Sequence, residues 1–304
     1  MSTYAILHGR RVNVVSSNPT NPKEGEVWYN STLGQLKGYV MGTAAWSSGG
    51  TYPTNIYGAA GAGNTPAGLA FGGYNGSGGI TTTSEYDGST WTGGGALPVA
   101  KRYLTGFGTQ TAALAAKGRV PTGSPSQIAT SEEYDGSSWT SGGTASVAVS
   151  MLSGSGTQTS GLVFGGTDSS RTNSTEEYNG SSWTTGGSLG TAKANLSGSI
   201  GGTQTAALAF FGDDGSTPLP TNTEEYNGTS WSEQNNVPAG RFAGGGAGTQ
   251  DAAYGFGGYT APGTPNQTTS TIKYDGTSWA SSASMATARG YNSGSAGLGA
   301  SGIF

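Results

Sequence analysis

The pattern of apolar and polar residues between positions 193 and 231 predicts four short strands in succession. Small residues dominate "KANLSGSIG" at 193–201, "GTQT" reads as a turn, and the apolar run "AALAFFG" predicts a buried strand. The loop "DDGSTPLPTN", with its two prolines, precedes a third strand at "TEEY", and a fourth strand begins at Trp231. The segment therefore predicts a unit of four antiparallel strands.

This unit recurs along the chain. The stretch "TEEYNGSSW" at 175–183 returns with small changes at 83–91, 131–139, 223–231 and 271–279. Tryptophans mark the period, with successive spacings of 45, 48, 44, 48 and 48 residues at Trp46, Trp91, Trp139, Trp183, Trp231 and Trp279. A repeat of roughly 40 to 50 residues that is rich in glycine and β-forming residues is typical of β-propeller blades.

The centre of each copy is Asn-Gly or Asp-Gly, which predicts a tight hairpin turn. A two-residue turn at Asn179 and Gly180 would place Tyr178 opposite Ser181, with Trp183 diagonal to Tyr178 on the same face. Each copy is then expected to place an aromatic pair against the neighbouring blade. We interpret the repeat as a packing device and not as repeated chemistry.

Five units are complete, and a fragment remains at each end of the repeat region. The segment "LKGYVMGTAAW" at 36–46 is expected to form a third and a fourth strand, and 285–304 a first and a second strand. Together they predict a sixth blade in which the two ends of the chain close the ring. We therefore expect an all-β, six-bladed propeller with four-stranded blades at 34–304, preceded by a separate segment at 1–33.

These units resemble the kelch repeat, which carries an arginine near its first strand, a double glycine, then a tyrosine and a tryptophan. The fifth unit fits with Arg241, Gly257-Gly258, Tyr274 and Trp279. The other units match in part, and "AAKGRV" at 115–120 replaces the double glycine of the second. The resemblance implies a propeller fold.

Composition restricts the classes of function. Of 304 residues, 57 are glycine, 10% are charged and 10% are aromatic, which indicates many tight turns in a folded chain. The net charge is −4 and no basic run extends beyond Arg10-Arg11, so nucleic acid is not an expected partner. The chain has no cysteine, which excludes disulfides and thiolate chemistry. No apolar run reaches membrane-spanning length, so no membrane partner is expected.

The first 33 residues have apolar groups of their own. "AILHGRRVNVV" predicts two short strands around Gly9, too few to bury a core, with an apolar face at Tyr4, Ile6, Leu7, Val12 and Val14. We interpret this segment as a docking arm that pairs with a neighbouring subunit or with another protein of the same assembly. The alternative is that it packs along the side of its own propeller.

The following segment, "NPTNPKEGEVWYNSTLGQLKGYV" at 18–40, resembles the openings of tailed-bacteriophage structural proteins, especially fibre and decoration proteins. The resemblance implies a protein made in the host cytoplasm and carried in the virion in several copies. Its expected partners are other virion proteins and, on the host, a surface glycan or receptor.

Candidate chemistry is sparse. The copper oxidases among kelch propellers need a cysteine and two histidines, whereas the only histidine here is His8. The sialidase turn is not matched, because Asp87 and Gly88 are adjacent. The Asp213-Asp214 pair could hold Ca²⁺, but an exposed turn is the simpler interpretation. No catalytic residue, metal or cofactor is therefore expected.

Three repeated features are given structural roles. The paired glutamates beside the hairpin turns are interpreted as a solvated strand edge. Arg102, Arg241 and Arg289 are taken to share one first-strand position. The "GTQT" glutamines are expected to ring one end of the channel and to join blades through hydrogen bonds.

The connections divide into a uniform set and a variable set. Turns between the first and second strands and between the third and fourth are nearly identical, whereas the loops from second to third strand differ. Variable loops on a rigid frame usually carry binding, which places a recognition face at Arg119, Arg171, Asp213, Asp214 and Tyr259. The function expected is a non-enzymatic virion structural or attachment protein of a tailed phage. The alternatives are a carbohydrate- or protein-binding propeller on a cell surface and a glycan-active hydrolase or lyase.

Overall fold

A computed structural model describes residues 12–17, 27–32, 34–38, 45–121, 126–261 and 266–291. The chain divides into two compact units, Met1–Ala45 and Trp46–Phe304. The boundary expected from the sequence lies earlier, between residues 33 and 34. Within the described residues both units contain strands and no helix.

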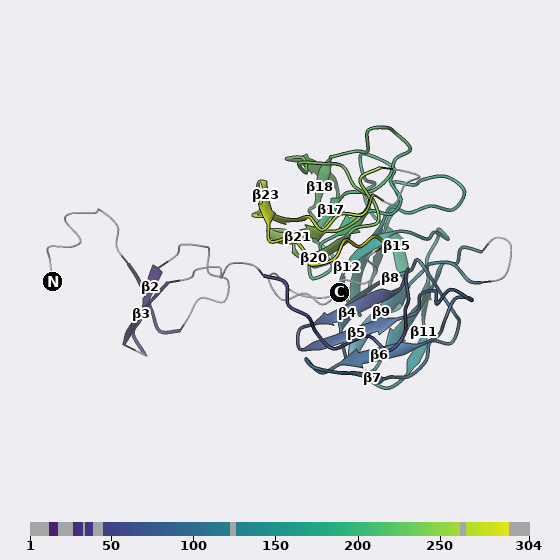
Figure 1. Cartoon of the computed structure of the whole chain (residues 1–304), viewed down its shortest axis with the longest axis horizontal. Helices are drawn as coiled ribbons and strands as arrows, with labels where there is room; N and C mark the ends of the chain where they lie inside the picture. Colours follow the sequence, from purple (N-terminus) through teal and green to yellow (C-terminus); the bar gives the residue numbers. More distant parts are fainter. Residues whose placement is uncertain are drawn as a thin grey trace, which may run out of the picture. The chain divides into compact units, whose positions relative to one another are not determined.

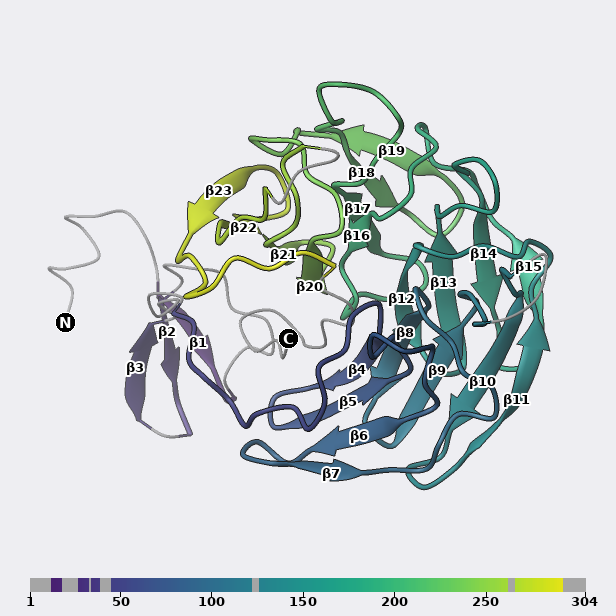
Figure 2. The same ribbon diagram turned by 45° about the vertical axis from the view of Figure 1, so that its right-hand side comes forward.

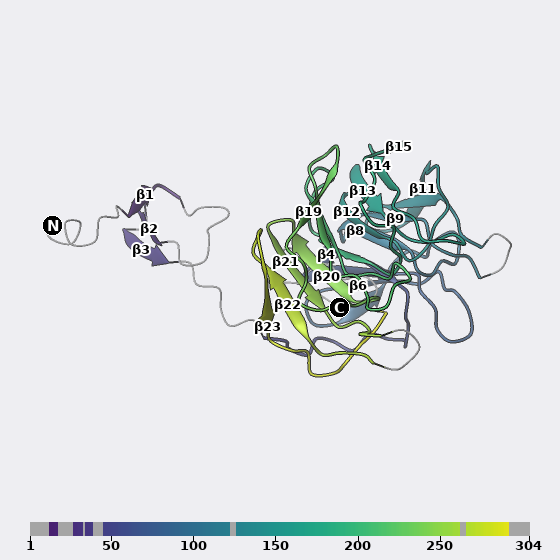
Figure 3. The same cartoon turned by 90° about the horizontal axis from the view of Figure 1, so that it is seen from above.

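The N-terminal unit contains one three-stranded sheet (Figure 3). The strand β1 (Asn13–Val15) runs parallel to β2 (Val27–Asn30), and β2 pairs with β3 (Gln35–Gly38) in the antiparallel sense. The predicted hairpin around Gly9 falls on residues outside those described. The structure instead pairs β1 with a strand that follows the proline-rich segment.

The second unit contains five four-stranded antiparallel sheets, which are the blades of a β-propeller (Figure 1). In Figure 2 the first strand of each blade lies toward the axis and the fourth at the outside. The blades are β4 (Ala60–Asn64), β5 (Ala67–Phe71), β6 (Thr83–Tyr86) and β7 (Trp91–Gly93); β8 (Thr105–Thr109), β9 (Ala112–Ala116), β10 (Thr130–Tyr134) and β11 (Trp139–Thr144); β12 (Ser153–Thr157), β13 (Ser160–Phe164), β14 (Thr175–Tyr178) and β15 (Trp183–Thr185); β16 (Ser197–Gly198), β17 (Ala207–Phe210), β18 (Thr223–Tyr226) and β19 (Trp231–Gln234); and β20 (Gly245–Thr249), β21 (Ala252–Phe256), β22 (Thr271–Tyr274) and β23 (Trp279–Ser282).

Six four-stranded blades were expected, and the described residues form five. The segment assigned to the third strand of a sixth blade is instead β3 of the N-terminal sheet at Gln35–Gly38. The rest of that expected blade lies largely at 39–44 and 292–304, outside the described residues. A closing blade shared by the two ends of the chain is therefore not part of the described fold.

The repeated hairpin differs from the predicted register. Tyr178 pairs directly with Trp183 across β14 and β15, so the turn has four residues and not two. The Asn179 side-chain oxygen accepts hydrogen bonds from the backbone N–H groups of Ser181 and Ser182, and Gly180 takes a φ of 91°. This side-chain bonding stabilises a longer turn than the dipeptide alone predicts. The expected aromatic pair is present, with ring centroids 4.8 Å apart.

The aromatic pair joins each blade to the preceding one. The Tyr178 hydroxyl donates to Glu133 at 2.8 Å, and the Trp183 indole N–H donates to the Ser131 hydroxyl at 3.1 Å. The same two contacts recur at three other junctions, through Tyr134 and Trp139, Tyr226 and Trp231, and Tyr274 and Trp279. The repeated residues therefore hold the ring of blades together, as expected of a packing device.

The interpretation of the glutamate pairs as a solvated edge is wrong. The first glutamate of each pair is buried, with Glu132, Glu176 and Glu224 at 5%, 1% and 3% exposed. Each forms an ion pair with a buried lysine: Lys101–Glu132, Lys117–Glu176 and Lys193–Glu224. Burial lowers the pKa of all three lysines, that of Lys193 to about 8. The second glutamate of each pair accepts a hydrogen bond from a tyrosine of the next blade. Both glutamates therefore have structural roles.

The glutamines of the "GTQT" turns donate hydrogen bonds to the preceding blade. The prediction that they join blades is therefore confirmed. The Gln204 amide donates to the backbone oxygens of Gly161 and Tyr178, at 3.0 and 2.8 Å. Equivalent pairs of bonds are made by Gln110, Gln158 and Gln250. Because both amide hydrogens are engaged, these groups rigidify the turn face.

Candidate functional site

The loops from second to third strand and the connections between blades lie on one face of the propeller, here called the loop face. Around the axis, this face is formed by one residue of each blade, just before its first strand. These residues have positive φ, and in the second to fifth blades a backbone hydrogen bond runs from this residue to the preceding blade, for example from Met151 N to Tyr103 O at 2.9 Å. The ring consists of Gly58, Tyr103, Met151, Asn195 and Ala243, and Tyr291 has the same backbone conformation. Their spacings repeat those of the tryptophans, so the fold places variable side chains at equivalent points around the axis.

Aromatic side chains gather on one sector of this face. Tyr57 lies 5.1 Å from Tyr74, 6.3 Å from Tyr103 and 6.3 Å from Tyr291, measured between ring centroids. Tyr291 also contacts Tyr259, at 5.3 Å. Gly58 allows this packing, because a Cβ there would lie 2.9 Å from the Tyr103 ring. Burial and the neighbouring Tyr57 raise the pKa of Tyr103 to about 12, so its hydroxyl is protonated at neutral pH.

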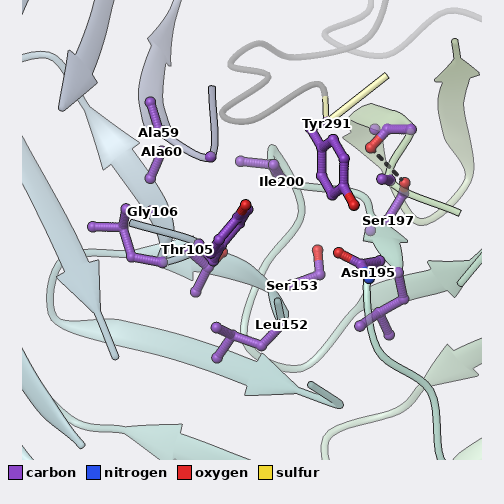
Figure 4. A pocket seen from close by; sticks show the side chains of 18 residues that line it. Ala59, Ala60, Thr105, Gly106, Leu152, Ser153, Asn195, Ser197, Ile200 and Tyr291 are labelled. Carbon is purple, nitrogen blue, oxygen red and sulfur yellow. Dashed lines mark hydrogen bonds between the residues drawn. The ribbon is translucent and has the colours of Figure 1, made fainter. Parts of the chain in front are cut away.

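A cavity of about 80 Å³ opens at the axis beside this sector. Tyr103 and Tyr291 line one part of it, and Ser153, Asn195 and Ser197 line another. Figure 4 shows the polar ends of Ser153 and Asn195 directed toward the Tyr291 ring. The Ser197 hydroxyl donates to Gly244 O at 3.0 Å, whereas the Asn195 side-chain amide makes no hydrogen bond within the described part of the chain. The cavity thus combines aromatic faces with neutral polar groups.

A second hollow, a groove of about 210 Å³, lies between the third and fourth blades. It is lined by Met151, Thr167, Ser169, Ser170, Arg171, Ala194, Asn195 and Asp213. The Arg171 guanidinium donates to the Asp213 carboxylate at 2.7 Å, and both side chains are partly exposed. Asn195 lines both hollows, so it lies between the groove and the axial cavity.

The predicted recognition residues all lie on loops from second to third strand, but the structure brings only some of them together. Arg171 and Asp213 meet in the groove between the third and fourth blades. Asp214 is next to this pair and accepts from Ser216. Arg119 lies on the second blade, where its Nε donates to Ser126, and Tyr259 stacks on Phe242 in the fifth blade. The predicted face is therefore spread over four loops, of which only the two that carry Arg171 and Asp213 meet.

The Asp213-Asp214 pair is engaged by protein groups. Arg171 and the Gly215 N–H bond Asp213, and the Ser216 N–H and hydroxyl bond Asp214. Among the described residues no three histidine, cysteine, aspartate or glutamate side chains are grouped so as to hold a metal ion. The same residues include no helix with the length and apolar character needed to cross a membrane.

The expectation that Arg102 shares its position with Arg241 and Arg289 is wrong. Lys101 is the residue equivalent to Arg241, because both reach the third strand of their own blade, Lys101 at Thr130 and Arg241 at Ser270. Arg102 instead lies over the Tyr74 ring, 4.7 Å from its centroid, and its Nε is buried without a hydrogen-bond partner. Arg102 therefore belongs to the aromatic sector.

The sequence analysis did not predict four residues that lie around the axis on the loop face: Tyr57, Tyr103, Asn195 and Tyr291. A signal for them was present, since Tyr103, Asn195 and Tyr291 follow the same spacing as the tryptophans. The signal is hidden because the side chain changes from blade to blade, and only the backbone conformation repeats.

The N-terminal sheet exposes an apolar face. Val12, Val14, Val27 and Tyr29 are 44%, 68%, 46% and 38% exposed. Val14 is paired with Tyr29 across β1 and β2, which places these two side chains next to each other. Tyr4, Ile6 and Leu7, the other residues of the expected docking arm, lie outside the described residues.

The chain matches no protein-family model and no curated protein. The kelch and bacteriophage resemblances thus rest on the motifs themselves.

Proposed function

We propose that this protein is a non-enzymatic structural or attachment protein of a tailed-phage virion, in which the propeller is a rigid recognition scaffold and the N-terminal sheet is the anchor. The observation that carries the proposal is that the two compact units present two different kinds of surface. The first unit presents Val14 and Tyr29 on an exposed sheet face, and the second presents variable loops on a frame of bonded blades. Such a division suits a protein that is held through one unit and binds through the other.

The anchor is tested by charging the exposed sheet face. The variant Val14→Glu/Tyr29→Glu should fold but fail to enter particles, because an apolar docking surface does not tolerate unpaired charges. Virions are purified and the protein is quantified by mass spectrometry. The control is Val99→Glu, which changes a valine of the propeller that is 44% exposed. Removing residues 1–26 should likewise prevent incorporation, and normal incorporation of both variants would refute the anchor.

Recognition by the variable loops is tested separately. Replacing the five loops from second to third strand with one neutral loop should abolish binding to the host while the propeller stays folded. Unchanged attachment would refute this part of the proposal. The alternative, a carbohydrate- or protein-binding propeller on a cell surface, uses the same loop face. Absence of the protein from purified virions would favour that alternative.

We also propose that the ring is completed by a kelch-like sixth blade to which both ends of the propeller unit contribute. Two contacts support it. The Trp46 indole N–H donates to Thr271 at 3.1 Å, the bond that Trp279 makes to Thr223 at 3.0 Å one junction earlier. Tyr291 contacts Tyr259 of the fifth blade and Tyr57 beside the first. The ends of this unit thus repeat contacts that blades make elsewhere.

A further inference from the structure

We propose that the groove between the third and fourth blades and the axial cavity, both of which Asn195 lines, form one binding site for a neutral oligosaccharide. The inference rests on the proposed role of the loop face in recognition. One sugar ring lies in the groove beside Arg171 and Asp213, and a substituent of the next sugar enters the axial cavity beside Tyr291.

The sizes of the two hollows fit this division. The groove, of about 210 Å³, is the larger of these two hollows and is assigned the sugar ring. The axial cavity, of about 80 Å³, is the smaller one and is assigned a hydroxymethyl or acetamido substituent.

The charge of the site favours a neutral ligand. Arg171 and Asp213 already neutralise each other at 2.7 Å, and the remaining groove residues carry no charge. An arginine–carboxylate pair still offers free N–H donors and acceptor lone pairs to hydroxyls that both donate and accept. A charged ligand would have to compete with an existing ion pair.

The Asn195 amide suits a ligand rich in hydroxyls. It is partly exposed and makes no hydrogen bond to any described residue, and it offers two donors and an acceptor to the hollows that it lines. Groups of this kind lose free energy when they are shielded from water without a partner. Across the cavity, Tyr103 and Tyr291 present aromatic rings, on which the apolar C–H face of a sugar can stack. A peptide anchor would need a deeper apolar pocket.

Binding is tested by saturation-transfer difference NMR on the full-length protein with lactose, maltotriose and N,N′-diacetylchitobiose. We expect at least one to bind, and Asn195→Ala and Tyr103→Met to raise its Kd at least tenfold. Both replacements occur naturally at this position of other blades, as Ala243 and Met151 with φ of 53° and 59°, so the backbone is expected to tolerate them. The control Asn179→Ala changes an asparagine in a β14–β15 turn, on the opposite face, and should leave the Kd unchanged.

Three outcomes would overturn the proposal. The first is that none of the three saccharides binds at millimolar concentration, and the second is binding that survives both variants in folded protein. The third is tighter binding of N-acetylneuraminic acid than of the neutral sugars, which would make the site anion-selective. Peptides from a random library that bind wild type but not Asn195→Ala, without saccharide binding, would assign the site to a peptide. Virion incorporation is measured independently, so failure here leaves the anchor proposal standing.

Discussion

At the scale of single residues, the same two positions at a junction between blades hold either an ion pair or two apolar side chains. Lys117, in the left-handed conformation after β9, reaches Glu176 of the next blade. The equivalent residues two junctions later are Phe211 and Ile272, which pack in one apolar cluster. The ion pair is thus replaced by apolar side chains at one position of a common backbone. Neither an ion pair nor two apolar side chains leave a charge unpaired, whereas one charged and one apolar side chain would leave a buried charge without a partner.

The first prediction concerns this pair. Glu176→Ala should lower the free energy of unfolding by about 3–5 kcal/mol, because Lys117 would remain buried without its partner. The triple variant Lys117→Phe/Ser146→Pro/Glu176→Ile should recover most of this loss. The proline is included because Ser146 N–H donates to Glu176, and Pro238 stands at the corresponding place of the apolar junction. Urea unfolding provides the measurement, and equal instability of both variants would contradict the prediction.

At the scale of elements, the hairpin turn between the third and fourth strands uses asparagine and aspartate interchangeably. Asn179 and Asp135 each accept from the two backbone N–H groups that follow in the turn. The bonds from the Ser138 N–H and from Ser137 hold the pKa of Asp135 at about 2, below its usual 3.8. Since the folded value is the lower one, the stabilisation is present above about pH 4 and is lost as the pH falls toward 2.

The second prediction is a reciprocal exchange in these turns. Asp135→Asn should keep its stability at pH 7 and lose part of the pH dependence of unfolding between about pH 4 and 2. Asn179→Asp should gain dependence over the same range. The midpoint of urea unfolding is measured at several pH values. Parallel curves for wild type and both variants would show that the turns do not contribute to acid sensitivity.

The third prediction concerns the tyrosines that join the blades. Burial, followed by the hydrogen bond to Glu133, raises the pKa of Tyr178 to about 12 from its usual 10. The unfolded chain therefore releases this proton first, and stability should fall as the pH rises from about 10 to 12. Tyr178→Phe should cost about 1 kcal/mol at pH 7 through the lost hydrogen bond, and should reduce the alkaline slope. Melting temperatures across this range provide the measurement, and an unchanged slope would contradict the prediction.

At the scale of the whole molecule, the way the propeller unfolds depends on whether its ring is closed. Trp46 packs on Phe256 with ring centroids 5.3 Å apart and donates to Ala283 O, so the start of the propeller unit is bound to its last described blade. An open array would allow its terminal blades to unfold separately, whereas a closed ring couples them.

The fourth prediction follows from this coupling. Trp46→Ala should destabilise the propeller by about 3–5 kcal/mol, as Trp231→Ala should at an internal junction, and both variants should unfold in a single transition. Calorimetry provides the measurement. A small effect of Trp46→Ala, or a separate early transition of the terminal blades, would show that the ring is open.

The sequence alone determined the repeat, its four-stranded unit and the aromatic pair, because strand alternation, turn residues and period are local properties of the chain. The extent of the hairpin turn was not local, since it depends on the Asn179 side chain bonding the backbone of Ser181 and Ser182. The sequence also located the variable loops, and with them Arg171 and Asp213.

Only the tertiary structure decided which charges are buried and which loops meet. Glu176 and Lys117 are 59 residues apart, and they approach because adjacent blades bring β9 and β14 together. The axial site has the same origin, since Tyr103, Asn195 and Tyr291 come from different blades and converge only around the axis. Contacts between distant segments depend on how the blades pack, and residue spacing within a single repeat does not predict that packing.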